Sequence, residues 1–494
     1  MKVLGYGFKV WVQFLPPSPN LPKKGCDEVF ESFKSFISKV VNRVLNKGGV
    51  QEKLGVEIAV SDKMSQAIEM WTKLYEGAPH THNANYKKMD LAASIASELA
   101  RLTTLELDSS ITGNDFLNEQ YQEVLKNIRI YTEFACAKGG VVFKPYVNEE
   151  SIEVDCVQAD CFYPISYNSR GDITSAAFLE YKVVGKDLYT RVEHHNLVKE
   201  GYHINNRAFL KKNYSVVSTD NLGQPIPLQS VDDWSSLAED VTIKNVNRPL
   251  FAYFKMPLAN HIDNKSPLGV SVFSRAIQSI EEADKQYDRI LWEYEGSELA
   301  IDADDGVFKR DTEGNLIMPA GRERLFRALG FDNEEMYKVY SPTIRDVSLF
   351  NGLNQLLRKI EFKCGLAYGV LSDAQESDKT AEEIKSSKQR SYSTVKDIQR
   401  NLQFALEQLV EAMDVLCKLY NLETGAYEMS FNWDDSLIMN KDVELASMQA
   451  DVSAGILRPE IYLAKKYGCS EEEALKMMPN VEESIKSPFH GLEE

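Results

Sequence analysis

Four groups of residues in this chain of 494 amino acids have types and spacings that could bind a ligand or do chemistry. Clustered histidines and carboxylates are common metal ligands, and they also act as acids and bases in hydrolysis. Clustered arginines instead bind phosphates and acidic partners. The four groups are His194, His195 and His203; the acidic segment 302–315; the carboxylates Glu281, Glu282, Asp284 and Asp288; and the arginines Arg322, Arg324 and Arg327.

Neither the histidines nor the acidic segment has the spacing of a metal site. Adjacent residues on a strand point to opposite faces, so His194 and His195 cannot bind one ion without distortion. The segment "DADDGVFKRDTEGN" lacks both the Asp/Asn spacing of a calcium loop and the glutamate that completes it. Its Asp-Gly and Glu-Gly pairs are typical of hairpin turns. We therefore expect ordinary strand and turn positions, with no metal and no cofactor.

The four carboxylates between residues 281 and 288 lie on a predicted helix that also has an apolar stripe. A solvated helix face is the default interpretation of such a pattern. The rival hypothesis is a hydrolytic enzyme that uses these acidic side chains, in which case substituting Glu281 and Glu282 together would abolish turnover. No nucleophile–base pair can be assigned, and no phosphate-binding P-loop is present. We therefore expect neither an enzyme nor a motor.

The composition is that of a folded globular protein with an acidic balance. Hydrophobic residues make up 43% of the chain and charged residues 26%, and the formal net charge is -18. A chain of this length is expected to form two or more modules. Static gripping of nucleic acid needs a basic footprint, because neutralised phosphates supply most nonspecific affinity. The protein either has no role with DNA or handles DNA without tight adhesion.

The sequence contains no sign of a membrane span or of disulfide bonds. No run of about 18 apolar residues is present, and the apolar N-terminal stretch has no small-residue cleavage site, so we expect no secretory signal. The seven cysteines are scattered, odd in number and form no CxxC motif. This pattern favours reduced thiols in a cytoplasm.

The first half of the chain is predicted to be helical and then rich in strands. Helices are predicted over residues 31–47, over "NYKKMDLAASIASELARLTTLEL" and over about 115–138, the last ending at Gly139. From about 141 to 254, short β-rich runs alternate with turns, and the polar stretch 218–234 is predicted to be exposed.

The second half has a distinctive order of elements. A helix with its apolar stripe follows residue 266, short strands are predicted over 299–343, and a further helix follows Pro342. The polar stretch from Ser372 to Lys379 then precedes a helix of about 380–420 with one long apolar stripe. Several short C-terminal helices follow, the last capped by Ser470 with Glu473 at the third position.

This order resembles that of the portal proteins of tailed bacteriophages. The stretches that carry the resemblance are "SPLGVSVFSRAIQSIEEADKQYDRILWEYE", residues 299–343, "IRDVSLFNGLNQLLRKIEFK", "GVLSDAQESDKTAEEIKSSKQRSYSTVKDIQ" and "DVSAGILRPEIYLAKKYGCSEEEALKMM". "KKMDLAASIASELARLTTLEL" and "GGVVFKPYV" also look like the early wing helix and the following strand of that family. The resemblance covers about residues 85–480, and its individual motifs are degenerate.

The resemblance implies an α+β, mainly α, portal-type fold. It divides the chain into an N-terminal segment of unknown role (1–30), a wing (31–265), a stem helix (266–298), a clip (299–343), a second stem helix (344–364), a tunnel loop (365–380), a long wing helix (381–421), and the wing end with a C-terminal crown (422–494).

The resemblance also assigns roles to residues. The tunnel loop would present Ser372, Asp373, Gln375, Glu376, Ser377, Asp378 and Lys379 to DNA, although a plain surface loop is the alternative. The clip would present Lys309, Arg310, Arg322, Arg324 and Arg327 to a partner, with ordinary surface charge as the alternative. Glu281, Glu282, Asp284 and Asp288 would form an acidic face of the stem.

The implied partners are those of a channel in a virion, at the portal vertex of the capsid. They are other copies of the chain in a ring of twelve, the terminase large subunit, scaffold and major capsid proteins, head-completion or adaptor proteins, and double-stranded DNA. Assembly would take place in the host bacterial cytoplasm, with no membrane involved. Another phage structural protein, such as a minor head or baseplate component, is the alternative within the same class.

Overall fold

The chain forms two compact units, Met1–Phe431 and Asn432–Glu494. This computed structural model describes residues 47–78, 86–148, 150–212, 222–303, 309–314, 316–317, 326–328, 337–373, 381–433 and 441–478. The segment 1–30 and almost all of the helix predicted over 31–47 lie outside these ranges. Helices and strands both contribute substantially, which confirms the α+β class.

Within the described residues, five helices precede the first large sheet. They are α2 (Lys47–Leu54), α3 (Asp62–Tyr75), α4 (Leu91–Thr104), α5 (Asp115–Leu125) and α6 (Ile128–Lys138). The single helix expected over 115–138 is wrong, because Asn127 leaves the helical region and its N–H bonds to Val124 O, three residues back. The apolar spacing continues across this break, so periodicity alone does not reveal it.

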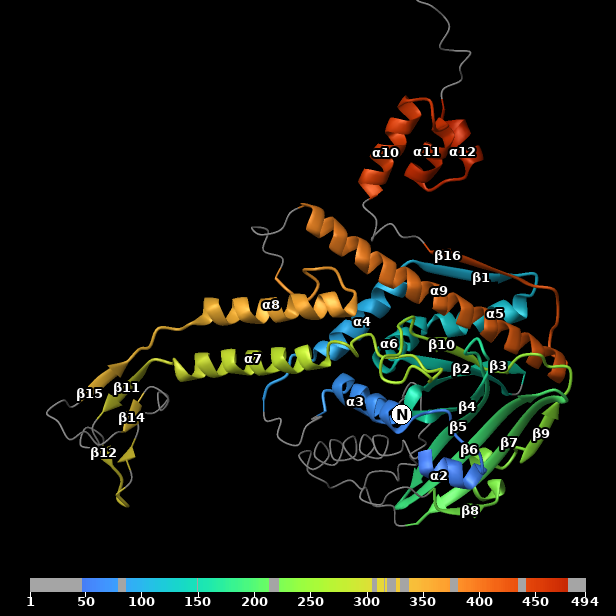
Figure 1. Ribbon diagram of the computed structural model, residues 1–494, viewed down its shortest axis with the longest axis horizontal. Helices are drawn as coiled ribbons and strands as arrows, with labels where there is room; N and C mark the ends of the chain where they lie inside the picture. The colour runs from blue at the N-terminus through green and yellow to red at the C-terminus, as the bar shows by residue number, and fades with distance from the viewer. Residues whose placement is uncertain are drawn as a thin grey trace, which may run out of the picture. The chain divides into compact units, whose positions relative to one another are not determined.

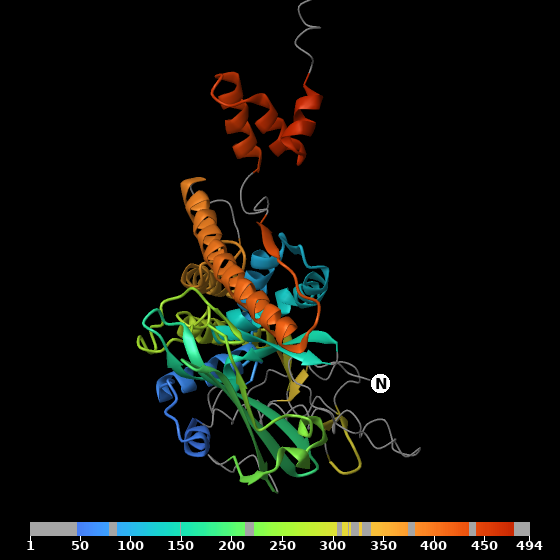
Figure 2. The ribbon, with the colours of Figure 1, turned by 90° about the vertical axis from the view of Figure 1, so that its right-hand side faces the viewer.

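A three-stranded antiparallel sheet lies at the centre of the first unit. Its strand order is β10-β2-β3, formed by β2 (Gly140–Asn148), β3 (Ser151–Gln158) and β10 (Ala252–Lys255). Helix α9 (Ala381–Tyr420) runs across β2 and β10, as Figures 1 and 2 show. The long helix predicted over about 380–420 is therefore present, and its apolar stripe from Val395 to Leu416 is buried.

A second, larger antiparallel sheet follows β3 in the chain. Its order is β4-β5-β6-β7-β8, and β9 pairs with β7. The strands are β4 (Phe162–Tyr167), β5 (Ile173–Val184), β6 (Asp187–Val198), β7 (Gly201–Lys211), β8 (Gln224–Ile226) and β9 (Asp240–Ile243). Three short 3-10 helices accompany it: η1 (Ala159–Cys161), η2 (Leu228–Ser230) and η3 (Asp232–Trp234).

The stretch 218–234, predicted to be an exposed excursion, is in part a small core. Leu228, Val231 and Trp234 are buried and form a hydrophobic cluster with Ala208 of β7. Residues 218–221 of the stretch lie outside the described ranges. The prediction failed because the three apolar residues are scattered among polar ones and follow neither a helical nor a strand period.

A helical hairpin carries a small sheet at its tip. Helices α7 (Ile277–Gly296) and α8 (Asp346–Cys364) pack side by side, and the sheet follows from the chain between them (Figure 1). In this sheet β11 (Ala300–Ala303) pairs in parallel with β14 (Phe326–Ala328) and antiparallel with β15 (Tyr337–Tyr340). A separate two-stranded ladder joins β12 (Lys309–Arg310) to β13 (Leu316–Ile317).

The remaining described elements are a β ladder and the helices of the second unit. Strand β16 (Glu428–Trp433) pairs with β1 (Leu107–Thr112). The second unit contains α10 (Lys441–Ser453), α11 (Pro459–Tyr467) and α12 (Glu471–Met477). The predicted capping box of the last helix is present: Ser470 and Glu473 bond reciprocally through side chain and backbone. None of the helices in the described ranges combines the length and apolar character needed to cross a bilayer.

The described cysteines are all unpaired. Cys136, Cys156, Cys161, Cys364 and Cys417 are buried as free thiols, and Cys469 is half-buried. Burial raises the pKa values of Cys136 and Cys156 well above their ordinary range, so these thiols stay protonated. Buried, unpaired thiols in this part of the chain are consistent with the expected reduced cysteines.

Two glycines allow the end of α6 to touch the segment before α7. Gly139 ends α6 with a φ of 89°, and a Cβ on Gly269 would overlap the Gly139 carbonyl oxygen. The contact is backbone against backbone, so no side-chain movement can relieve it. We predict that Gly269→Ala lowers stability by about 1–3 kcal/mol, measured as a drop in Tm.

The matched control for this substitution is Gly296→Ala at the end of α7. A Cβ there meets open space, so this change should leave Tm unchanged or raise it slightly. Equal Tm values for the two variants would contradict the predicted contact.

Candidate functional site

The hairpin of α7 and α8 is the candidate functional site, because it carries or adjoins every residue group to which a role is predicted. Polar contacts fasten its two helices at both ends. Near the small sheet, Arg345 donates from Nε and Nη2 to the Glu293 carboxylate at 3.0 and 2.8 Å. At the other end, Lys363 Nζ donates to Ser279 Oγ at 2.8 Å. The paired geometry of the first contact resists sliding of one helix along the other.

The four carboxylates of α7 do not form one solvated face. Asp284 is 3% exposed, and its Oδ1 accepts a hydrogen bond from Met89 N at 2.9 Å. Asp288 Oδ1 accepts from Lys87 N at 2.9 Å. Asp284 and Asp288 therefore both bind the segment that leads into α4. Of the other two carboxylates, Glu281 is half-buried and Glu282 is exposed. Placing Asp284 on an exposed acidic face was wrong, because a backbone amide satisfies its charge in the interior.

The predicted clip residues are only partly described. Lys309 and Arg310 are exposed on β12, where Arg310 Nη1 donates to Gly314 O at 3.0 Å. Arg327 lies in β14, next to β11. Arg322 and Arg324 lie outside the described residues. The structure therefore places basic residues on the strands carried by the hairpin, and their partner-facing role stays a prediction.

The predicted tunnel loop is described only at its start. Gln375, Glu376, Ser377, Asp378 and Lys379 lie outside the described residues. Asp373 is exposed, and its N–H donates to Asn354 Oδ1 at 2.8 Å. Ser372 is 6% exposed, and both its N–H and its hydroxyl donate to Glu361. A DNA-facing role for Ser372 therefore does not fit, since a buried carboxylate occupies its polar groups.

The three histidines do not converge. His194 Nε2 lies 2.9 Å from Ser175 Oγ, while His195 contacts Tyr202 and Glu193, each at 2.7 Å. His203 lies on the next strand, opposite Asn196. Across the described ranges, no three metal-binding side chains come together. His194 and His195 thus have separate partners, which agrees with the expectation that adjacent strand residues point to opposite faces.

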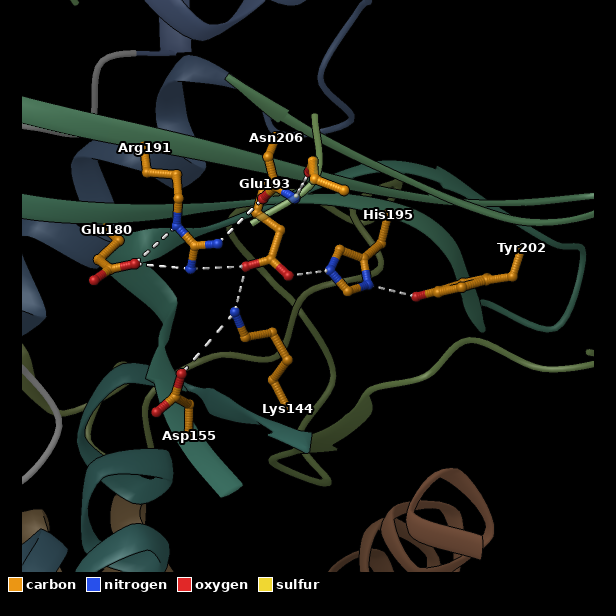
Figure 3. Close-up of polar contacts among 9 residues, drawn as sticks. Lys144, Asp155, Glu180, Arg191, Glu193, His195, Tyr202 and Asn206 are labelled. Atoms are coloured by element: carbon orange, nitrogen blue, oxygen red, sulfur yellow. Dashed lines mark hydrogen bonds and ion pairs between the residues drawn. The ribbon is translucent and has the colours of Figure 1, made fainter. Parts of the chain in front are cut away.

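An ionic cluster that joins the large sheet to the three-stranded sheet was not anticipated from the sequence. Its centre is Glu193, which contacts Lys144 Nζ at 2.5 Å, Arg191 Nη2 at 3.2 Å and His195 Nε2 at 2.7 Å (Figure 3). We call Lys144, Asp155, Glu180, Arg191, Glu193 and His195 the Glu193 cluster. The signal that could have revealed it is the spacing of Arg191, Glu193 and His195, which places all three on one face of a strand.

The comparison with known families decides what kind of protein this is. The family model described as "Phage portal protein, SPP1 Gp6-like" matches residues 61–486, more than half of the chain. The chain belongs to the phage portal protein family. The resemblance read from the order of its elements is confirmed, and this portal protein is a structural component of the head-to-tail connection in a bacteriophage.

Comparison with solved structures and with curated proteins gave two further findings. A chain of the "Neck of native GTA particle computed with C12 symmetry" matches with a TM-score of 0.41 and 11% sequence identity. The match covers 77% of this chain and 90% of that one. No curated protein matches the sequence.

Burial and neighbouring charges shift the pKa values of Glu193 and His195 in the Glu193 cluster of this portal protein. Burial alone would raise the pKa of Glu193, but Lys144, Arg191 and His195 together hold it well below its usual range. Burial lowers the pKa of His195, although Glu193 acts in the opposite direction. The folded protein therefore favours an ionised Glu193 beside a neutral His195.

These shifts predict a loss of stability in acid. Because the folded pKa of His195 lies below the unfolded value of about 6.5, its contribution is complete above that pH and is lost as the pH falls through it. The contribution of Glu193 is lost at lower pH, below about 4.3. His195→Gln should flatten the fall in Tm between pH 8 and pH 5 relative to wild type. If the slope of Tm against pH is unchanged in His195→Gln, His195 is not the source of the acid sensitivity.

Proposed function

We propose that twelve copies of this portal protein form a ring at one capsid vertex and that double-stranded DNA is packaged and ejected through its channel. The observation that carries the proposal is the order of the hairpin elements: α7, the small sheet, α8, the turn that begins at Gly365, and then the long helix α9. This order lies within the part of the chain that matches the portal family.

Exposed apolar side chains on the hairpin support a ring. Trp292 and Val347 are 66% and 69% exposed, and Phe350 is 45% exposed. Large apolar side chains at such exposure are expected to be covered by another protein surface. In a closed ring, one face of each hairpin would contact a different face of its neighbour, which is a heterologous interface.

The charge of the chain supports a channel through which DNA slides. A net charge of -18 disfavours persistent adhesion to phosphates. In this proposal, the terminase large subunit would dock during packaging at the clip, against the basic side chains of Lys309, Arg310, Arg322, Arg324 and Arg327. Head-completion or adaptor proteins would replace the terminase afterwards. Scaffold and major capsid proteins would contact the ring during assembly in the host cytoplasm.

Ring formation gives the most direct test. Mass photometry of the purified chain should detect a large discrete oligomer, with twelve copies as the expected stoichiometry. Electron microscopy of the same sample should show rings with a central hole. A monomer at all salt and protein concentrations, even with scaffold protein added, would contradict the proposal.

The clip assignment makes a separate prediction. Reversing the charge at Arg322 and Arg324, each to Glu, should impair terminase docking and DNA packaging and leave the rings intact, because an acidic docking partner would then be repelled. The matched control reverses Lys186 and Lys199, two exposed lysines at the turns of the large sheet. Packaging at the normal level in the clip variant would rule out this role.

A further inference from the structure

The turn that follows α8 is held by both backbone and side-chain hydrogen bonds. Gly365 ends the helix with a φ of 73°, and its N–H bonds to Phe362 O. Leu366 N–H bonds to Glu361 O at 2.9 Å, so the backbone forms a Schellman motif. This motif sets the path of the chain directly after the helix.

The side chain of Glu361 binds the same turn a second time. Its Oε1 accepts hydrogen bonds from the N–H groups of Gly369, Leu371 and Ser372 at 3.0, 2.7 and 2.9 Å. Its Oε2 accepts from the Ser372 hydroxyl at 2.8 Å. Four donors thus surround one carboxylate, and three of them are backbone amides that point toward a single oxygen.

The position of Glu361 would be unfavourable without these donors. Glu361 is 0% exposed and lies in the last turn of α8, where the helix dipole repels negative charge. A buried ionised carboxylate is tolerated only when hydrogen bonds replace its water. The fold of residues 369–372 and the burial of the Glu361 carboxyl group therefore depend on each other.

Helix α9 holds the other side of the turn. Gly365 abuts Thr394 so closely that a Cβ at position 365 would overlap the threonine side chain. The Arg390 guanidinium lies over the rings of Phe362 and Tyr368, at 4.6 and 5.3 Å from their centres. The turn is therefore fastened between α8 and α9.

We propose that Glu361 is a positioning residue that sets the direction in which the chain leaves α8 toward the predicted tunnel loop. The inference rests on the proposed function, because it assigns Glu361 a role in DNA packaging and retention. The residues that Glu361 binds lie in the described first part of the predicted loop, and Asn354 extends the same attachment to Asp373. We expect rings to form without this contact, because the four donors to the Glu361 carboxylate belong to the same subunit.

The test uses full-length portal rings carrying Glu361→Ala, Glu361→Gln or Ser372→Ala. Hydrogen exchange of the Gly369, Leu371 and Ser372 amides should accelerate by roughly tenfold or more in Glu361→Ala, because each of these amides loses its side-chain acceptor. Glu361→Gln keeps an oxygen for the three amides and should restore most of the protection. Glu119→Gln, at an exposed position on α5, is the matched control and should match wild type.

The functional readout is the fraction of phage heads that fill with DNA and keep it. We expect this fraction to fall several-fold in Glu361→Ala, less in Ser372→Ala and least in Glu361→Gln, with ring mass unchanged in all three. Normal filling and retention in Glu361→Ala rings whose turn has lost protection would overturn the inference. If Glu361→Ala does not form rings, the same test applies to Ser372→Ala: normal filling and retention by rings whose turn has lost protection would overturn the inference. Failure of wild type itself to form rings would instead count against the proposed function.

Discussion

The burial of one face of helix α9 is the constraint on which most of the first unit depends. An isolated helix of 40 residues with a single apolar stripe is not stable in water unless that stripe is covered. In this protein the cover comes from distant parts of the chain, namely α4, β2 and β10. Polar contacts fix the register: Gln399 Nε2 donates to Thr103 O at 3.2 Å, and Asn401 Nδ2 donates to Lys255 O at 2.9 Å.

A second common feature is the way this acidic protein treats its buried carboxylates. Asp284, Glu193 and Glu361 are all removed from water, and each lies where N–H donors or cations meet it. Lys144 and Arg191 contact Glu193. One backbone amide donates to Asp284, and three donate to Glu361. The net charge of the chain therefore says little about where its acidic residues act. Some of them join segments of the chain rather than repel a passing polyanion.

Much of the element order could be predicted from the sequence, because long periodic patterns reflect which helix faces are buried. The helices α7, α8 and α9 and the capping box at Ser470 follow such local rules. The break at Asn127 escaped prediction because the apolar spacing runs straight through it. Residues such as Asp284 and Ser372 were misplaced for a different reason. Their burial depends on partners that lie far away in the chain or in a turn, and composition cannot reveal them.

The Glu193 cluster was missed for the same physical reason. Arg191, Glu193 and His195 are visible as a period of two, but Lys144 comes from another sheet. Alternating charge on a strand normally indicates a solvated face, and only the packing of the two sheets reverses that interpretation. Sites built on local order can therefore be read from sequence, whereas sites built on long-range pairing need the fold.

The pairing of the three-stranded sheet β10-β2-β3 has a consequence for how this architecture can vary. Val141 of β2 pairs with Gln158 of β3 on one side and with Phe254 of β10 on the other. Since neighbouring strands lie about 4.8 Å apart, the chain leaves this sheet and returns to it about 10 Å away. Everything between residues 158 and 254 is thus an insertion with adjacent ends. Loop-closure entropy rises only slowly with length, so its outer strands can be lengthened, shortened or exchanged while the helical hairpin and α9 keep their places.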